Sequence, residues 1–526
     1  MDTVCKTISR LLAALLALLC LAGCSKSAKR DTPVSASVIP LPEDLPVLTY
    51  PLITSGDTPA SLVEMERQFN IYCAEKIGAT IRFVTVDVNT LENYYLLRQF
   101  GEEAVDFIAL MPAVTQLADM VDAGLVMPLD GLLEEHGQGV AAAAAEVLPV
   151  GQIGGIQYMI PAVKDVYTMG TSIEFNAALV KKYGFDIHAV QTITDLEPML
   201  AVIAANEPGV IPLTAYGDTT GFTQLLSGYD SLGDTLGVLN LAEDDSLTVV
   251  DWYETDRFLE LARLMRDWNE KGYIDRDAAV RQVSGTLQVR SGGAFCSIGT
   301  ITPVGGDLGT NLDSASGMAE VQLADQSQMY NSYNVALEGI CISSSCREPE
   351  KAIALLDLLY TDPYAANLIV SGVEGTDYVF NEDGLADDGG SVFLLFGQPI
   401  NQSLRYMSTG IGTEYETRCA AFTANDTVSP AFGFVFDSSP VAREMALCRT
   451  VVKQYYPLID CGCVNPDTEI PKFVTALKDA GIETVVAEKQ RQLDAWSRTM
   501  SRHFLIAAND IDAGVVFPVS PDEVLS

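Results

Sequence analysis

The sequence predicts an α/β protein with at least two lobes, and two observations lead to this prediction. Between Thr58 and Gly124, stretches with helical apolar spacing alternate with short β-rich stretches. That alternation is typical of a parallel sheet covered by helices on both faces. The chain also has 526 residues, which is more than one hydrophobic core usually serves, so we expect at least two cores.

The first helix is predicted from its start and stop signals. Thr58 can act as the N-cap with Pro59 in the first helical position, and Gly78 ends the helix. Apolar side chains recur on one face at helical spacing; these are Leu62, Met65, Phe69 and Tyr72.

The next segments repeat the alternation. The β-rich run 79–88 is followed by a helix over 94–100, a strand over 105–111 and another helix that ends at Gly124. Strand, helix, strand, helix and strand in this order predict a βαβαβ opening and hence parallel pairing.

The N-terminus predicts export. Lys6 and Arg10 precede an uncharged run from Leu11 to Ser25, which is shorter than the about 20 residues of a membrane-spanning helix. No run of about 18 apolar residues follows it. Residues 1–23 are therefore interpreted as a signal peptide, and 24–45, which are rich in Ser, Lys and Pro, as a flexible tether.

The signal peptide closes on Leu21-Ala22-Gly23-Cys24, which resembles the lipobox of bacterial lipoproteins. This resemblance implies cleavage before Cys24, a diacylglycerol on its sulfur, and acyl chains such as palmitate. Two or more acyl chains anchor a protein stably. We therefore expect a lipid-anchored protein on the extracellular face of the cell membrane; plain secretion is the alternative.

The composition of the chain indicates which classes of ligand and cofactor it is suited to bind. The formal net charge is −38, so nucleic acids and anionic polymers are disfavoured and a neutral or cationic solute is favoured. The three histidines lie far apart and the closest cysteine pairs lack zinc-site spacing, so we expect no metal site and no cofactor. The disulfide state of the eight mature cysteines stays open.

Several phrases in order resemble the extracellular solute-binding proteins of bacterial ABC importers, whose best-known ligands are oligosaccharides. Among them are "VDFIALM", "LADMVDAGLVMPLDGLLEEHG", "GGIQYMIPA" and "FNAALVKKYGFD". "CREPEKAIALLDLLYTDP", "GVEGTDYVF" and "LKDAGIETVVAEKQRQLDAW" resemble a lipoprotein branch with long C-terminal additions. The resemblance runs from Leu48 to Trp496, and residues 500–526 match nothing.

The resemblance implies a two-lobed periplasmic-binding-protein-like (type II) fold whose hinge the chain crosses three times. The crossings are expected near 160–164, 297–302 and 371–378. Lobe one would then comprise 46–163 and 301–372, and lobe two 164–300 and 373–526. A solute would bind between the lobes and close them.

A sugar presents an apolar face and a rim of hydroxyls, so aromatic residues near carboxylates and amides are the candidate ligand contacts. Trp252 stands out because the chain has only three tryptophans, although packing at a helix start is the alternative. The candidate ligand-binding residues, none of them catalytic, are Asp106, Met111, Tyr167, Met169, Tyr216, Trp252, Tyr253, Tyr330 and Tyr333.

The sequence therefore predicts a non-enzymatic, monomeric receptor that hands an oligosaccharide to the permease subunits of an ABC importer. A peptide ligand is an alternative. So is a surface-anchored glycoside hydrolase, which needs only two suitably spaced carboxylates. A calcium-stabilised adhesion lipoprotein would rest on "NEDGLADDGG" and "AEDDS", but neither fits the EF-hand pattern.

Overall fold

The computed structural model describes residues 44–511, except 55–57, 88–104, 111–116, 215–220, 226, 243–245, 276, 281–283, 304–311, 314–315, 327 and 390–397; side chains are not described at 278 and 500–511. The described residues all fall within one compact unit, 43–526. The expected signal peptide, Cys24 and nearly all of the expected tether lie outside them, as does the helix expected over 94–100.

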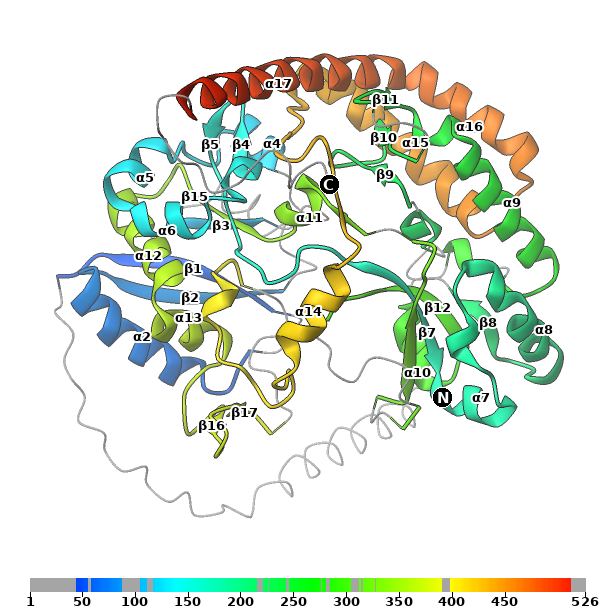
Figure 1. The fold of residues 1–526 in the computed structure, drawn as a ribbon, viewed down its shortest axis with the longest axis horizontal. Coiled ribbons are helices and arrows are strands. Elements are labelled where there is room, and N and C mark those ends of the chain that lie inside the picture. The colour runs from blue at the N-terminus through cyan, green and yellow to red at the C-terminus, as the bar shows by residue number, and fades with distance from the viewer. Residues whose placement is uncertain are drawn as a thin grey trace, which may run out of the picture. The chain divides into compact units, whose positions relative to one another are not determined.

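A first lobe forms around paired strands of the N-terminal half (Figure 1). Strand β1 (Val47–Thr54) pairs in parallel with β2 (Thr80–Asp87), as expected. Strand β3 (Phe107–Leu110) instead pairs antiparallel with β15 (Gly339–Ile342), which also pairs with β6 (Ile160–Pro161). The expectation of an all-parallel sheet is wrong at β3, because a strand from much later in the chain returns beside it.

Helix α2 (Leu62–Lys76) buries Met65, Phe69 and Cys73 at helical spacing. It begins later than expected, and the Ser61 hydroxyl before it donates to the Asp377 carboxylate instead of capping it. The other elements of this lobe are α4 (Leu117–Asp122), α5 (Asp130–His136), α6 (Gln138–Ala143), η2 (Leu148–Gly151), β4 (Gln152–Ile153), β5 (Ile156–Gln157), α12 (Pro349–Thr361), α13 (Pro363–Val370), β16 (Val379–Phe380), β17 (Ala386–Asp387) and η8 (Gln402–Leu404).

A second lobe is built on a mixed sheet in the order β13-β7-β12-β8. Strand β7 (Gly170–Asn176) lies antiparallel between β13 (Met318–Gln322) and β12 (Ala294–Ile301), and β12 is parallel to β8 (Ile211–Thr214). The boundary expected at residue 301 is therefore corrected, because β13 pairs with the second sheet.

The boundary expected at residue 373 also shifts. Val373 and Ile400 are buried among the side chains of the first lobe, together with Tyr50 and Phe69. The chain thus remains in the first lobe beyond the expected third crossing.

Helix α9 (Asp256–Glu270) illustrates how the second lobe buries its helices. Thr255 caps it by accepting the Phe258 N–H, and the buried face carries Leu261, Met265 and Trp268. The lobe also contains α7 (Ala177–Tyr183), η3 (Ile187–Ala189), η4 (Ile193–Leu196), α8 (Glu197–Asn206), η5 (Phe222–Leu225), β9 (Tyr229–Asp230), β10 (Val238–Asn240), β11 (Val249–Val250), η6 (Trp252–Glu254), η7 (Ala278–Val280) and α10 (Gly285–Ser291).

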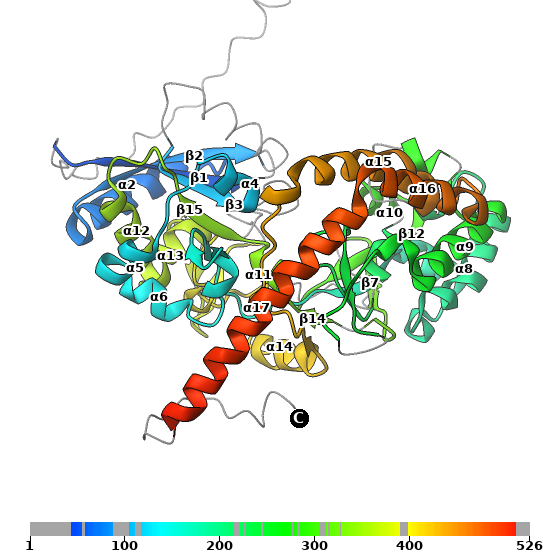
Figure 2. The same cartoon turned by 90° about the horizontal axis from the view of Figure 1, so that it is seen from above.

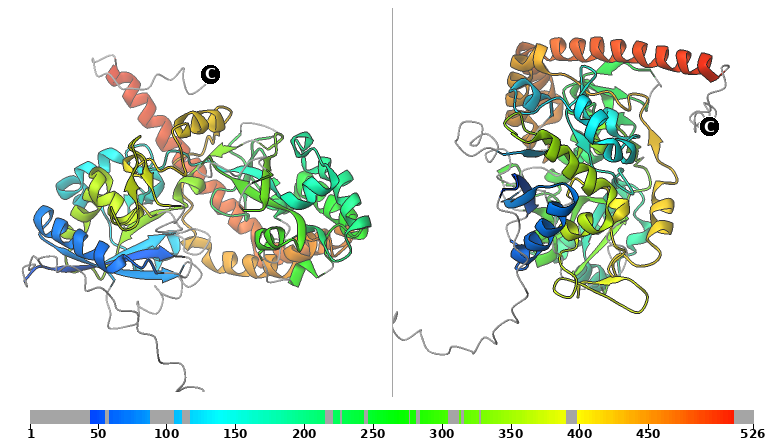
Figure 3. Two further views of the ribbon diagram at one scale, coloured as in Figure 1. Left: turned by 90° about the horizontal axis from the view of Figure 1, so that it is seen from below. Right: turned by 90° about the vertical axis from the view of Figure 1, so that its left-hand side faces the viewer.

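The C-terminal helices complete the second core. Helix α17 (Ile482–Ile511) follows α16 (Pro466–Ala480) and buries Val485 and Leu493 in this core. Its C-terminal end projects from the molecule, as Figures 2 and 3 show. The remaining elements are β14 (Met329–Tyr330), α11 (Ser332–Ala336), α14 (Tyr415–Thr423), β18 (Thr427–Val428), η9 (Ser439–Val441) and α15 (Ala442–Asp460).

In the described part of the chain, no single helix is both long and apolar enough to cross a membrane. Helices α12 and α13 reach that length and composition only as a pair bent by 90°. The eight cysteines among the described residues are all free thiols, and all but Cys463 are buried. They act as small apolar core residues in this structure.

Candidate functional site

The segment 162–169 carries the chain from β6 in the first lobe to β7 in the second. The Lys164 ammonium pairs with the Glu338 carboxylate at 3.0 Å, with only 12% and 21% of the side chains exposed. The Thr168 hydroxyl donates to Asp426 at 2.6 Å. Contacts from one short segment therefore hold residues that lie far apart in the sequence.

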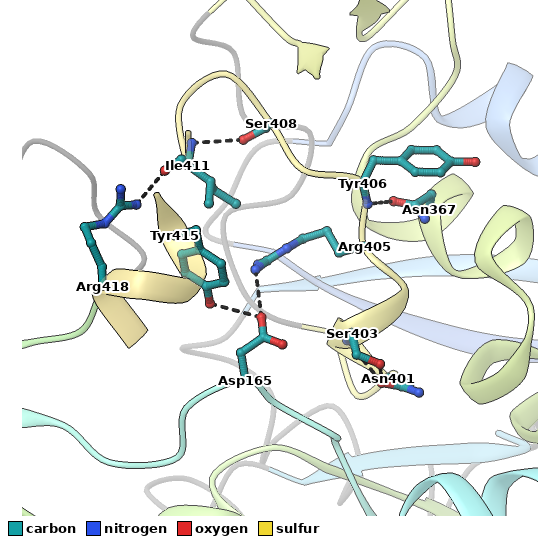
Figure 4. Close-up of polar contacts among 10 residues, drawn as sticks. All are labelled: Asp165, Asn367, Asn401, Ser403, Arg405, Tyr406, Ser408, Ile411, Tyr415 and Arg418. Atoms are coloured by element: carbon teal, nitrogen blue, oxygen red, sulfur yellow. Dashed lines mark hydrogen bonds and ion pairs between the residues drawn. The ribbon is translucent and has the colours of Figure 1, made fainter. Parts of the chain in front are cut away.

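A polar cluster, which Figure 4 shows, lies at the same segment. The Asp165 carboxylate accepts hydrogen bonds from Arg405 at 3.2 Å and from the Tyr415 hydroxyl at 3.0 Å. The Arg405 guanidinium also lies 5.6 Å from the centre of the Tyr415 ring. Burial is the main reason that the pKa of Tyr415 is raised, so this hydroxyl stays protonated and donates. The cluster offers a sugar both donors and an acceptor.

Three aromatic rings from three separate segments contact one another, beginning with Tyr167, two residues after Asp165. The Tyr167 and Tyr330 rings meet edge to face at 5.4 Å, and Tyr330 lies 4.7 Å from Phe432. The Tyr167 hydroxyl donates to the Ala162 carbonyl and accepts the Lys164 N–H. Burial raises its pKa to about 12. Tyr167 and Tyr330 are only half-buried, so part of this aromatic surface remains open.

An apolar pocket, which we call the interlobe pocket, lies between side chains of the two lobes and encloses about 710 Å³ of empty space, open solvent included. Its lining includes Leu110, at the carboxyl end of β3, and Leu232, Phe434 and Met445 from the second core, together with Tyr333. Ligands of α/β proteins typically bind at such strand ends.

The backbone beside the interlobe pocket is strained. Leu232 has φ +49° and is the one non-glycine residue with positive φ in the described ranges. Asp230, which is 2% exposed, holds this turn by accepting the Leu232 N–H, and it also accepts Asn331 Nδ2 and the Ser429 hydroxyl. Such strain persists only where the surroundings fix it, so the pocket wall is pre-formed.

The structure brings three of the sequence candidates to this region. Tyr167 and Tyr330 contact each other, and Tyr333 lines the interlobe pocket. Whether a ligand touches them stays a prediction.

The remaining candidates are distributed differently. Asp106 precedes β3 and accepts the Thr49 N–H at 2.7 Å, so it binds two strands together. Met169 is 37% exposed and lies one residue before β7. Met111 and Tyr216 lie outside the described residues.

The expectation for Trp252 and Tyr253 is wrong in this structure. Trp252 is 0% exposed and meets the rings of Tyr229 and Phe258 edge to face, and Tyr253 is 2% exposed. Tyr253 also bonds the Thr235 hydroxyl at 2.6 Å and packs on Phe473. These rings are covered by protein on both faces, which is the packing role that the sequence left as the alternative.

Sequence reasoning missed Asp165, Arg405 and Tyr415. Asp165 directly follows the expected first crossing, and a charge at such a position was the available signal. No sequence pattern connects it with Arg405 and Tyr415, because their proximity depends on the tertiary fold.

No group of three or more His, Cys, Asp or Glu side chains in the described ranges could hold a metal ion. Within "NEDGLADDGG", the Asn381 side chain accepts the Asp383 and Leu385 N–H groups, and Asp387 accepts the Gly389 N–H. These oxygens serve the turns of a hairpin.

Comparisons with known proteins identify the fold and a relative. A family model described as "Domain of unknown function (DUF3502)" matches residues 430–498. A "Carbohydrate ABC transporter substrate-binding protein" of Streptococcus pneumoniae serotype 4 is 26% identical over 467 residues, or 84% of this chain and 89% of that protein.

Among solved structures, the N-glycan transport solute binding protein (NgtS) from Streptococcus pneumoniae superposes with a TM-score of 0.73 at 24% identity, over 86% of this chain and 99% of that one. Its complexes with Man1GlcNAc and Man5GlcNAc give 0.70 and 0.69. The alginate-binding protein AlgQ2 gives 0.61 at 15% identity, over 86% of this chain and 98% of that one. The α/β, periplasmic-binding-protein-like fold is confirmed, and so is the resemblance to solute-binding proteins of ABC importers.

Proposed function

We propose that this protein is the lipid-anchored receptor of an ABC importer that captures a neutral oligosaccharide outside the cell membrane and delivers it to the permease. The observation that carries the proposal is the match to a carbohydrate-transporter relative over 84% of the chain. The likeness extends through both lobes, which is what a binding protein that closes around a solute needs.

The local geometry supports a sugar ligand. The segment that joins the lobes carries the half-buried Tyr167, which contacts Tyr330, and also Asp165, which bonds Arg405 and Tyr415. Aromatic rings suit the apolar face of a pyranose, and the polar groups suit its hydroxyls. The net charge of −38 disfavours acidic polymers.

Transport by a receptor requires no catalysis, because ligand bridging the two lobes supplies the differential affinity that shifts an open form toward a closed one. The permease would recognise the closed form. A lipid on Cys24 would keep the receptor at the extracellular face of the membrane. Cys24→Ser should then abolish lipid labelling and release the protein from membranes; retention of that variant would contradict the anchor.

The ligand class is tested by thermal-shift screening of the purified protein against oligosaccharides, peptides and amino acids. A ligand that binds only the folded state raises the melting temperature, by an amount that grows with its concentration. Stabilisation by oligosaccharides alone supports the proposal. Stabilisation by peptides alone would establish the peptide alternative, and shortening of the added oligosaccharide, seen by mass spectrometry, would establish a hydrolase.

A further inference from the structure

A second pocket lies on the first lobe alone, between α2, α13 and the β16–β17 hairpin. We call it the tyrosine pocket. It encloses about 860 Å³ of empty space, open solvent included, and its main lining residues are Gln68, Tyr364, Asn367, Glu374, Tyr378 and Tyr406. None of these residues lines the interlobe pocket.

Three tyrosines, Tyr364, Tyr378 and Tyr406, line the pocket, and Phe380 packs against two of them. The Tyr378 ring lies 5.4 Å from Phe380 and 6.0 Å from Tyr406, and Phe380 lies 5.2 Å from Tyr406. On the opposite side, the Tyr364 ring rests edge to face on Tyr72 at 4.9 Å. Tyr364 is 42% exposed, whereas Tyr378 is only 8% exposed, so Tyr364 offers the open aromatic surface of the pocket.

Hydrogen bonds from the Asn367 and Asp377 side chains fix the backbone near these rings. Asn367 is 1% exposed, and its amide donates to the Pro363 and Leu404 carbonyls and accepts the Tyr406 N–H at 2.8 Å; Figure 4 shows this last bond. The Asp377 carboxylate accepts the Val373 N–H at 2.7 Å. The rings are therefore pre-organised, which lowers the entropy cost of binding.

Several polar groups of the pocket, although not the Asn367 amide, are available to a ligand. The described residues provide no hydrogen-bond or ion-pair partner for the Glu374 carboxylate or for the Tyr378 and Tyr406 hydroxyls. The Gln68 amide donates to the Glu64 carboxylate at 2.9 Å, and its oxygen accepts only a long bond, of 3.4 Å, from the Tyr364 hydroxyl. Among the described residues, no Lys or Arg lines the pocket, so it suits a neutral polyhydroxylated ring better than a phosphate or a carboxylate.

We infer that the tyrosine pocket is a carbohydrate subsite on the first lobe, where a pyranose stacks on Tyr364 and its hydroxyls bond Glu374 and Gln68. The inference rests on the proposed function for the ligand class and adds a place for a sugar unit outside the interlobe region. Such a subsite would contact one arm of a branched glycan, or a further unit of a long one.

The test uses methyl NMR of the purified protein with labelled Val and Leu side chains. Val379 lines the pocket and is 53% exposed, so its methyls report on it; Val163 reports on the segment between the lobes. Val379→Ile and Val163→Ile identify the two signals. Titration with Man5GlcNAc should shift the Val379 methyls in a saturable way.

Tyr364→Ala should weaken the apparent affinity read at Val379 about three- to tenfold, because a stacked ring is lost. Glu374→Gln should weaken it as well without removing any packing. Leu447→Ala, which removes an apolar side chain that is 44% exposed on α15, is the matched control and should leave the affinity unchanged.

The outcomes separate the two proposals. Shifts at Val163 with a silent Val379 would overturn the tyrosine pocket and leave the proposed function standing. Shifts at neither position would count against both. A Val379 response to a decaproline peptide but not to the glycan would also overturn the inference, because the pocket would then be a peptide site.

Discussion

Two aromatic regions of this protein, one in each lobe, differ in what surrounds them. The cluster around Trp252 in the second lobe is closed: Trp252, Tyr253 and Phe258 are all at most 2% exposed and meet mostly edge to face. The tyrosine pocket in the first lobe is open, with Tyr364 and Phe380 near 40% exposed. The same residue types thus stabilise the fold in one place and offer binding surface in the other.

The largest expected effect tests the closed region. Trp252→Ala should lower the free energy of unfolding by about 3–5 kcal/mol, because it leaves a cavity in a fully buried cluster. Glycan affinity of the folded fraction should not change. Denaturant unfolding measures the free energy of unfolding, and titration calorimetry measures the glycan affinity. Unchanged stability with lost affinity would mean that Trp252 contacts the ligand.

A buried lysine of α17, Lys489, contacts the turn at Asp234 in the second lobe. Lys489 is 0% exposed, lies 3.0 Å from the Asp234 carboxylate and donates to the Gly237 carbonyl. Lys489→Ala should cost about 3 kcal/mol of unfolding free energy, since it leaves Asp234 without its charge partner. Lys472→Ala removes a lysine that is 62% exposed on α16 and should cost far less unfolding free energy. Equal losses for the two variants would mean that the buried pair contributes no more than an exposed lysine does.

A buried carboxyl group in the second lobe should make the stability of the folded protein depend on pH. Burial raises the pKa of Glu320 from 4.5 to about 7, and the Glu174 carboxylate beside it adds to the rise. Below pH 4.5 both the folded and unfolded forms are protonated, whereas between about pH 4.5 and 7 only the unfolded form ionises. Glu320 therefore makes the folded state less stable as the pH rises through this window, by about 2–3 kcal/mol in all.

Glu320→Gln should remove this pH dependence and raise the unfolding free energy at pH 8, as measured by urea denaturation at several pH values. Glu135→Gln, at a carboxylate that is 77% exposed, is the control. An identical pH profile for wild type and Glu320→Gln would contradict a raised pKa.

The smallest effect is expected in the open region. Phe380→Ala should change the unfolding free energy by less than about 1 kcal/mol, because the side chain is 41% exposed and leaves no closed cavity. Scanning calorimetry beside Trp252→Ala gives the comparison directly. A loss as large as that of Trp252→Ala would mean that the tyrosine pocket is a core and not a binding surface.

Local patterns were sufficient for much of the fold. The apolar spacing of α2 and the β-rich run of β2 were enough to predict these elements, because the periodicity of each reflects one buried face. The antiparallel pairing of β3 with β15 could not be predicted, since it joins strands separated by the whole second sheet.

The candidate site was harder to predict for the same reason. Sequence identifies an aromatic residue but not its exposure, so Trp252 was chosen and Tyr364 was not. The sequence points to Tyr167 because it follows the first expected crossing and to Tyr330 because it precedes a β-rich stretch, whereas the contact between Asp165 and Arg405 depends on the tertiary fold.

The most direct test of the account is a calorimetric titration of the wild-type protein with Man5GlcNAc, followed by mass spectrometry of the recovered glycan. A receptor for neutral oligosaccharides should bind the glycan saturably and return it with unchanged mass. Absence of binding with this glycan and with other neutral oligosaccharides would contradict the proposed ligand class, and a shortened glycan would contradict a role in transport without catalysis.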